Sequence, residues 1–230
     1  MRKLAILMLL LLPFVIFAGV ELSETTISLM EKVQGDVNLP YVFGLNNIPM
    51  QLYINHIVQD DFSLALSQLY KYAEIEAAEF EKMGWGFRPY KINVSHKVTY
   101  NKGKYLSFYV DFYQYTGGAH GMTFRTAYTF DLSRGRITNL SELFACRYDF
   151  KEAIVKEINR QLKEILKTEP QKFFISEIKD LSGTGFYLEN DNLVIYYDLY
   201  EIAPYVEGIV EFSVPFELFG DKLLISTTEE

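Results

Sequence analysis

Two long stretches of the chain carry apolar residues at the three- and four-residue spacing of an amphipathic helix. The first begins at Asn47, a residue type that favours helix N-caps, and continues to about Lys82, with Gly84 where glycine commonly ends a helix. The second begins at Asp149, in a capping-box pattern with the glutamate three residues later, and ends before Pro170. Each predicted helix has an apolar stripe that another part of the fold must cover.

Between and after these helices the pattern alternates with a period of two residues, which is typical of strands that have one buried face. Short polar segments separate neighbouring strands and predict tight antiparallel turns. The sequence therefore predicts an α+β fold, with an antiparallel β-sheet and two long helices packed on one face of it. The expected strands cover residues 37–44, 88–100, 105–115, 122–131, 185–189, 192–200 and 209–214.

The strand expected at 105–115 has two chemically different faces. Leu106, Phe108, Val110 and Phe112 point one way, while tyrosines alternate with Ser107 and an aspartate on the other side. We expect the helices to cover the apolar face and the phenol face to stay open to a ligand. Tyrosines are also strong strand formers that pair across strands, so a purely structural role for this row is the alternative.

The first residues have the layout of a secretory signal. A basic pair at Arg2 is followed by an apolar run and by small residues at 18 and 19, which predicts a signal peptide at 1–18 and export from the cytoplasm. The run is short for a membrane-spanning helix, but an uncleaved N-terminal anchor is the alternative, and only then would a membrane be a partner. The other expected units are a flexible segment or first edge strand at 19–36, a single α+β unit at 37–220 with halves at about 37–140 and 141–220, and a tail at 221–230.

Composition narrows the range of partners. The net charge is −8, and it becomes two units more negative once Arg2 and Lys3 leave with the signal peptide. Such an acidic chain is a poor candidate for nucleic acid and a better one for basic proteins. A single cysteine, Cys146, excludes an intramolecular disulfide, so stability must come from a core that 49% apolar and 16% aromatic residues can supply.

Residues 113–121 contain the most distinctive motif of the chain, a tyrosine-rich strand end that runs into two glycines and a histidine. Gly117 and Gly118 can adopt positive φ, and Gly121 leaves His120 with little steric cover. His120 could therefore act as a general base, a ligand contact or a pH-sensitive group. Its ring nitrogens could equally bind loop carbonyl groups and hold the turn closed.

No familiar catalytic or metal-binding signature is present. The chain has no Gly-x-Ser-x-Gly, His-Glu-x-x-His or Walker lysine, and the spacing of His56, His96 and His120 indicates no metal site, so we expect no metal and no cofactor. An enzyme is the less favoured interpretation, in the form of a hydrolase with His120 as general base and Asp111, Glu201 or a tyrosine as partner. The residues expected to contact a ligand are Tyr105, Tyr109, Tyr113, Tyr115, His120 and Arg125.

The turn after the penultimate strand, Tyr200 to Tyr205, could extend this tyrosine surface or could only fix a tight connection directed by Pro204. Both interpretations remain open at the level of sequence.

Three ordered groups of residues resemble a known family. They are Asn38-Leu-Pro with Gly44-Leu-Asn and Ile54-Asn-His; Tyr115-Thr-Gly-Gly-Ala-His-Gly121 with Tyr128-Thr-Phe-Asp-Leu132, Gly135 and Leu140-Ser-Glu-Leu-Phe144; and Tyr200-Glu-Ile-Ala-Pro-Tyr205 with Gly208 and Ser213-Val-Pro215. Together they resemble the extracytoplasmic domain shared by RsiV-type anti-sigma factors and PdaC-type peptidoglycan deacetylases, in which two domains of unknown function follow one another.

The resemblance implies a sensor or binding domain rather than a catalyst. Residues 1–230 contain neither the metal-dependent deacetylase module of the PdaC branch nor the sigma-factor-binding half of the RsiV branch, so we expect the shared binding portion alone. The partners that the resemblance implies are an envelope protein, lysozyme-like in the RsiV branch, or a cell-wall glycan. The sequence leaves the oligomeric state open.

Overall fold

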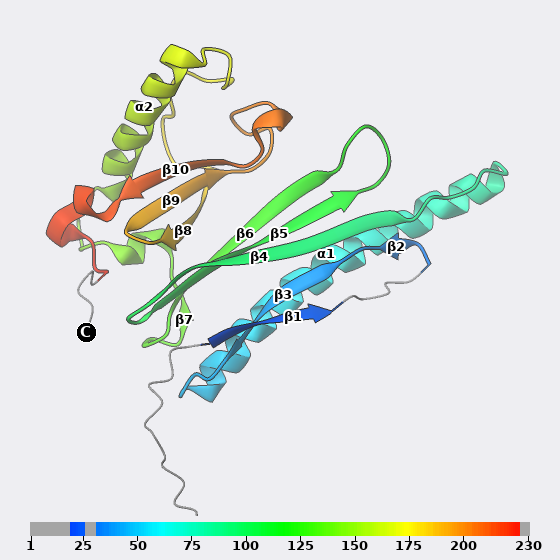
Figure 1. The fold of residues 1–230 in the computed structure, drawn as a ribbon, viewed down its shortest axis with the longest axis horizontal. Helices are drawn as coiled ribbons and strands as arrows, with labels where there is room; N and C mark the ends of the chain where they lie inside the picture. Colours follow the sequence, from blue (N-terminus) through cyan, green and yellow to red (C-terminus); the bar gives the residue numbers. More distant parts are fainter. Residues whose placement is uncertain (1–18, 26–30, 226–230) are drawn as a thin grey trace, which may run out of the picture.

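The computed structural model describes residues 19–25 and 31–225, in which two β-sheets pack face to face and each sheet carries one long helix (Figure 1). The layers run in the order α1, large sheet, small sheet, α2. The elements are β1 (Gly19–Thr25), β2 (Val33–Gln34), β3 (Val37–Phe43), α1 (Ile48–Lys82), β4 (Tyr90–Lys102), β5 (Tyr105–Tyr115), β6 (Met122–Asp131), β7 (Arg136–Ile137), α2 (Phe150–Thr168), β8 (Gly185–Glu189), β9 (Asn192–Tyr197) and β10 (Val210–Pro215), with 3₁₀ turns η1 (Leu140–Leu143), η2 (Tyr205–Glu207) and η3 (Phe216–Lys222).

Helix α1 begins and ends at the predicted residues. The Asn47 side chain accepts a hydrogen bond from the backbone N–H of Met50 at 3.0 Å, which satisfies one of the free donors of the first turn. At the other end Gly84 has φ +70°, and the Trp85 N–H donates to the Phe80 carbonyl at 2.8 Å. This is a glycine-terminated C-cap, and it fixes the position of Trp85 relative to the last turn.

The large sheet has the order β1-β3-β4-β5-β6-β7, with β2 beside β4. The predicted meander is confirmed, because β4, β5 and β6 pair antiparallel over most of their lengths. Strand β3 is parallel to β4, since α1 connects the two strands and returns the chain to the same edge. The apolar face of β5 packs against α1, as its alternation predicted, through the fully buried Leu106, Phe108 and Val110.

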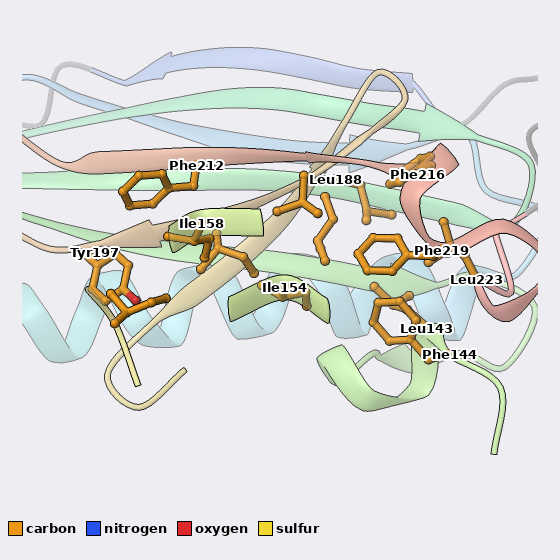
Figure 2. Close-up of a cluster of buried hydrophobic side chains, with 14 of the residues drawn as sticks. Leu143, Phe144, Ile154, Ile158, Leu188, Tyr197, Phe212, Phe216, Phe219 and Leu223 are labelled. Atoms are coloured by element: carbon orange, nitrogen blue, oxygen red, sulfur yellow. The ribbon is translucent and has the colours of Figure 1, made fainter. Parts of the chain in front are cut away.

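The small sheet has the order β10-β9-β8 and packs one face against α2. The Asp149 carboxylate caps this helix by accepting the N–H of Glu152 at 3.1 Å. Figure 2 shows Ile154 and Ile158 of α2 directed into a cluster with Leu188 of β8 and Phe212 of β10. These side chains are at most 1% exposed, so they form the core of the second half of the chain.

The α+β class with mostly antiparallel strands is confirmed, but the two helices do not share one face of one sheet. Helix α1 covers the large sheet and α2 covers the small one, and the small sheet lies on the phenol face of the large sheet. The reason is that β9 is apolar on both faces. Leu193 and Ile195 face α2, whereas Val194 and Tyr196 need cover from the other side, and β5 and β6 provide it.

The described segments at either end of the fold, residues 19–25 and 221–225, are both structured. The predicted signal peptide lies outside the described residues. Strand β1 pairs with β3 over residues 19–25, so this segment is an edge strand rather than a flexible one. Leu223 and Ile225 are buried, and Leu224 N–H donates to the Leu143 carbonyl, so residues 221–225 pack onto the fold instead of forming a tail.

Within the described ranges, no helix is both long enough and apolar enough to span a membrane.

Candidate functional site

Arg125 lies between the two sheets and holds them together. Its guanidinium binds both carboxylate oxygens of Asp111, at 2.6 and 2.7 Å, contacts Glu211 of β10, and lies 3.6 Å from the ring centroid of Tyr109. The side chain is only 8% exposed. Burial alone would lower the pKa of Arg125, but its hydrogen bonds to Asp111 and the nearby negative charges outweigh burial and raise it. Arg125 is therefore a buried clamp and is not available on the surface to a ligand.

Two of the predicted ligand contacts are likewise covered. Tyr105 is 3% exposed and belongs to the core beneath α2. Tyr109 packs against Tyr187 of β8 with ring centroids 5.2 Å apart, and burial raises the pKa of its phenol. The phenol face that we expected to be open is thus roofed at this end by the small sheet. Tyr105 and Tyr109 stabilise the contact between layers.

The exposed part of the motif lies at the other end of β5, where His120 meets the connection between β9 and β10. The imidazole stacks on Tyr205, with centroids 4.0 Å apart and planes at 25°. His120 Nδ1 lies 2.9 Å from the carbonyl oxygen of Gly121, and the Tyr200 hydroxyl lies 3.2 Å from Nε2. We call His120, Tyr200 and Tyr205 the histidine cluster. It joins a loop of the first half of the chain to a loop of the second.

The hydrogen bonds define the tautomer of the neutral ring. A carbonyl oxygen only accepts, so Nδ1 must carry the proton, and Nε2 is left to accept from the Tyr200 hydroxyl. Both ring nitrogens thus have partners, one on the backbone and one on a side chain.

The histidine loop is shaped by glycines and by two tyrosines. Gly117 and Gly118 have φ of +99° and +92°, values that side chains rarely adopt. The Tyr115 hydroxyl donates to the Gly118 carbonyl at 2.9 Å and closes the turn. Tyr113 packs onto Gly121, and both tyrosines remain partly exposed beside the cluster.

The carboxylates that a hydrolase would need do not converge on His120. Both oxygens of Asp111 bind Arg125, and the Glu201 carboxylate lies against the turn at Gly183. The imidazole is oriented by a backbone carbonyl, and in the part of the chain that the structure describes no group of His, Cys, Asp and Glu residues could hold a metal ion. What the cluster offers is aromatic surface with hydrogen-bonding edges.

Sequence reasoning left the roles of Tyr200 and Tyr205 open, and the structure brings both residues to His120. The available signal was an aromatic residue on each side of Pro204 in a connection between strands, which is a weak indication. The positive φ of Tyr200, +67°, is not readable from sequence, yet it helps to direct this side chain toward the histidine loop.

These features define the class of the protein: an α+β fold of two face-to-face sheets, built from two successive halves that share one aromatic loop cluster. Residues 30–123 match the family model described as Deacetylase PdaC, and residues 141–217 match that of a protein of unknown function, DUF3298. The chain therefore carries a PdaC-family domain followed by a DUF3298 domain. This confirms the resemblance found in its sequence.

Two characterised relatives come from Bacillus subtilis (strain 168). Peptidoglycan-N-acetylmuramic acid deacetylase PdaC is 22% identical over 166 residues, which cover 68% of this chain and 36% of the relative. Anti-sigma-V factor RsiV is 26% identical over 211 residues, which cover 82% of this chain and 65% of the relative. The chain thus spans less than two thirds of either protein, and the similarity suggests an envelope-associated domain.

Two solved structures share the fold. A DUF3298 family member from Bacteroides fragilis NCTC 9343 has a TM-score of 0.65 at 21% identity, and one from Pseudomonas aeruginosa PAO1 has 0.59 at 17%. Each comparison covers 90% of this chain and 94% of the other. At these identities the similarity establishes the architecture alone.

Proposed function

We propose that this chain is an exported, non-catalytic binding domain of the cell envelope, and that its ligand contacts the histidine cluster. The observation that carries the proposal is the stack of His120 on Tyr205 with Tyr200 beside it, an exposed aromatic surface built by loops from both halves. Tyr200 is 46% exposed and the neighbouring Val206 is 84% exposed.

Such a surface suits recognition because its side chains are already ordered. Tyrosine and histidine rings that stack on one another lose little further conformational freedom when a ligand covers them, so more of the contact energy remains as affinity. The Tyr200 hydroxyl donates its proton to Nε2 of His120, and its oxygen can still accept a hydrogen bond from a ligand. Exposed aromatic residues of this kind are enriched at the centres of protein interfaces.

The resemblance to the RsiV and PdaC families supports two classes of ligand, an envelope protein of the lysozyme type and a cell-wall glycan. The net charge of −8 favours a basic protein, because opposite charge accelerates encounter and disfavours anionic competitors. The alternative, a hydrolase that acts on wall material with His120 as general base, has weaker support, since neither Asp111 nor Glu201 contacts the imidazole.

The test is calorimetric titration of the exported domain with a basic lysozyme and, separately, with soluble muropeptides. We expect saturable binding of at least one of them, and we expect Tyr205→Ala to weaken lysozyme binding about tenfold or more, as for a central interface residue. Tyr72→Ala is the matched control, because Tyr72 is 64% exposed on α1 and makes no contact with the cluster. Absence of saturable binding to both ligands would refute the proposal, and release of wall fragments that depends on His120 would favour the hydrolase.

A further inference from the structure

A second surface includes residues 115–118 of the glycine-rich loop. A cleft of about 490 Å³ lies between the C-terminal end of α1, the segment that leads into β4, and residues 115–118. In Figure 1 these segments lie at the same end of the molecule. Helix α1 contributes Glu76 and Phe80 to this cleft, whereas the histidine cluster is formed with the connection between β9 and β10. The lining residues of the cleft are Glu76, Phe80, Gly86, Phe87, Arg88, Pro89, Tyr90, Tyr115, Thr116, Gly117 and Gly118.

Aromatic rings form one part of this lining and are held by contacts with one another. Phe87 packs against Tyr90 with centroids 5.5 Å apart and lies 6.3 Å from Phe80. Trp85, which precedes the lining residue Gly86 in the chain, meets Phe80 edge to face at 5.8 Å and remains 62% exposed. The contact with Phe80 accompanies the glycine C-cap of α1, where any apolar side chain would serve. This contact alone therefore does not explain why the position carries a tryptophan whose indole is mostly exposed to solvent.

Polar groups of both kinds form the rest of the lining. The Tyr90 hydroxyl donates to Glu76 Oε2 at 2.6 Å, so this carboxylate is fixed in direction while keeping further acceptor capacity. Burial and the bond to Glu76 raise the pKa of Tyr90 to about 12, so the phenol stays a neutral donor at physiological pH. Arg88 and the Thr116 hydroxyl add donors. The lining contains one carboxylate, that of Glu76, and one guanidinium, that of Arg88, so its net charge is zero.

We propose that this cleft binds a pyranose ring of an uncharged oligosaccharide. A pyranose has faces of C–H bonds, which pack on aromatic rings, and a rim of hydroxyls that each donate and accept hydrogen bonds. The cleft offers both kinds of surface within a volume typical of small-ligand sites. The inference rests on the binding function proposed above and assigns its glycan ligand to this cleft, leaving the histidine cluster to a protein ligand.

The chain provides its own reporter, because Trp85 is its single tryptophan. Titration of the full chain with chitotriose, an N-acetylglucosamine trimer, should give a saturable change in tryptophan fluorescence and a matching calorimetric heat. Cellotriose serves as the glucose arm. Binding of both sugars supports recognition of the pyranose ring itself, and binding of chitotriose alone supports an added contact to the acetamido group.

Glu76→Gln tests the site itself. It keeps an acceptor for the Tyr90 hydroxyl, so the fold should persist by circular dichroism, but it removes the charge from the hydrogen bonds to sugar hydroxyls. We expect about tenfold weaker binding of chitotriose, the loss typical of one charge-assisted hydrogen bond. Tyr72→Ala is again the control and should leave the affinity unchanged.

The outcomes separate this inference from the proposed function. Tyr205→Ala should weaken lysozyme binding but not chitotriose binding, and Glu76→Gln should do the reverse. If the folded protein binds neither sugar, or binds a proline-rich peptide here instead, the inference fails while lysozyme binding at the histidine cluster can still stand. Loss of chitotriose binding in Tyr205→Ala but not in Glu76→Gln would move the sugar to the histidine cluster and also overturn the inference.

Discussion

Gly121 is required by the space around it rather than by its backbone conformation. A Cβ atom at this position would lie 2.5 Å from both the Gln114 carbonyl oxygen and Cζ of Tyr113. The ring of Tyr113 therefore packs directly on the glycine backbone. This contact fixes the position of the adjacent His120. Gly121 has no side chain, yet it determines the geometry of the histidine cluster.

We expect Gly121→Ala to lower the free energy of unfolding by about 2 kcal/mol, because one methyl group must displace both a ring and a carbonyl. Urea unfolding measures the loss, and calorimetry should show weaker ligand binding at the histidine cluster. Gly86→Ala is the matched control, since no atom lies within 4 Å of a Cβ there. Equal stability of the two variants would show that Tyr113 can move aside at little cost.

Asp131 predicts a pH dependence of stability. Its buried carboxylate accepts from the N–H groups of Ser133 and Arg134, each at 3.0 Å, and pairs with Lys104 at 3.4 Å. Burial opposes ionisation, but the bonds from Ser133 and Arg134 and the charge of Lys104 outweigh it and lower the pKa of Asp131. Since the folded pKa lies below the unfolded one, this stabilisation is fully present above the unfolded pKa and is lost as pH falls through the folded value.

Asp131→Asn should therefore cost about 1–2 kcal/mol at pH 7, and the difference from wild type should shrink as the pH falls below the ordinary aspartate pKa of about 4. Urea unfolding at a series of pH values gives the comparison. The exposed Asp60, whose partner is the exposed His56, provides the control, and Asp60→Asn should stay within about 0.5 kcal/mol of wild type at pH 7. A constant cost for Asp131→Asn at every pH would contradict the charge argument.

At the scale of elements, strand β5 shows what could be read from the sequence and what could not. Its alternation correctly placed Phe108 and Val110 toward α1, because the period of a strand fixes which side chains share a face. Alternation does not reveal what covers each face. Tyr105, Tyr109 and Ser107 belong to the polar set by pattern, yet elements far along the chain bury Tyr105 and Ser107 and partly cover Tyr109.

The sequence pattern that indicates cover over the tyrosine face of β5 lies in β9 rather than in β5 itself. Residues 193–197 are continuously apolar and all buried, a pattern that indicates a strand covered on both faces. The residues of the candidate site likewise divide into those that the sequence indicated and those that it did not. The loop motif correctly drew attention to His120, but its neighbours Tyr200 and Tyr205 arrive through tertiary packing, and Trp85 and Glu76 resemble ordinary residues at a helix end.

The buried Arg125 predicts the strongest single effect on stability. Arg125→Met removes the cation and leaves Asp111 and Glu211 facing each other across the sheets, so we expect a loss of about 3–5 kcal/mol in urea unfolding. Arg160→Met is the control, because Arg160 is 63% exposed and pairs with Glu157 along one helix, and it should cost less than about 1 kcal/mol. Similar losses in the two variants would mean that water, not Arg125, satisfies Asp111.

At the scale of the whole molecule, the two family domains are joined by a continuous interface. Ser107 Oγ of β5 accepts the N–H of Leu188 in β8 at 3.1 Å, Lys97 pairs with Glu189 at 2.6 Å, and Arg125 reaches Glu211. The histidine cluster closes the interface at one end. Each half buries one face of the other's sheet, so neither half should keep its structure when the other unfolds.

We therefore expect a single cooperative unfolding transition, and two natural probes can test it. Trp85 reports on the first half by its fluorescence, and the exposed Cys146, the single cysteine, can carry a dye that reports on the second. The two urea midpoints should coincide, and Arg125→Met should lower both together, because the clamp belongs to both halves. Separated midpoints would show two independently stable domains, and the histidine cluster would then be a joint that opens without global unfolding.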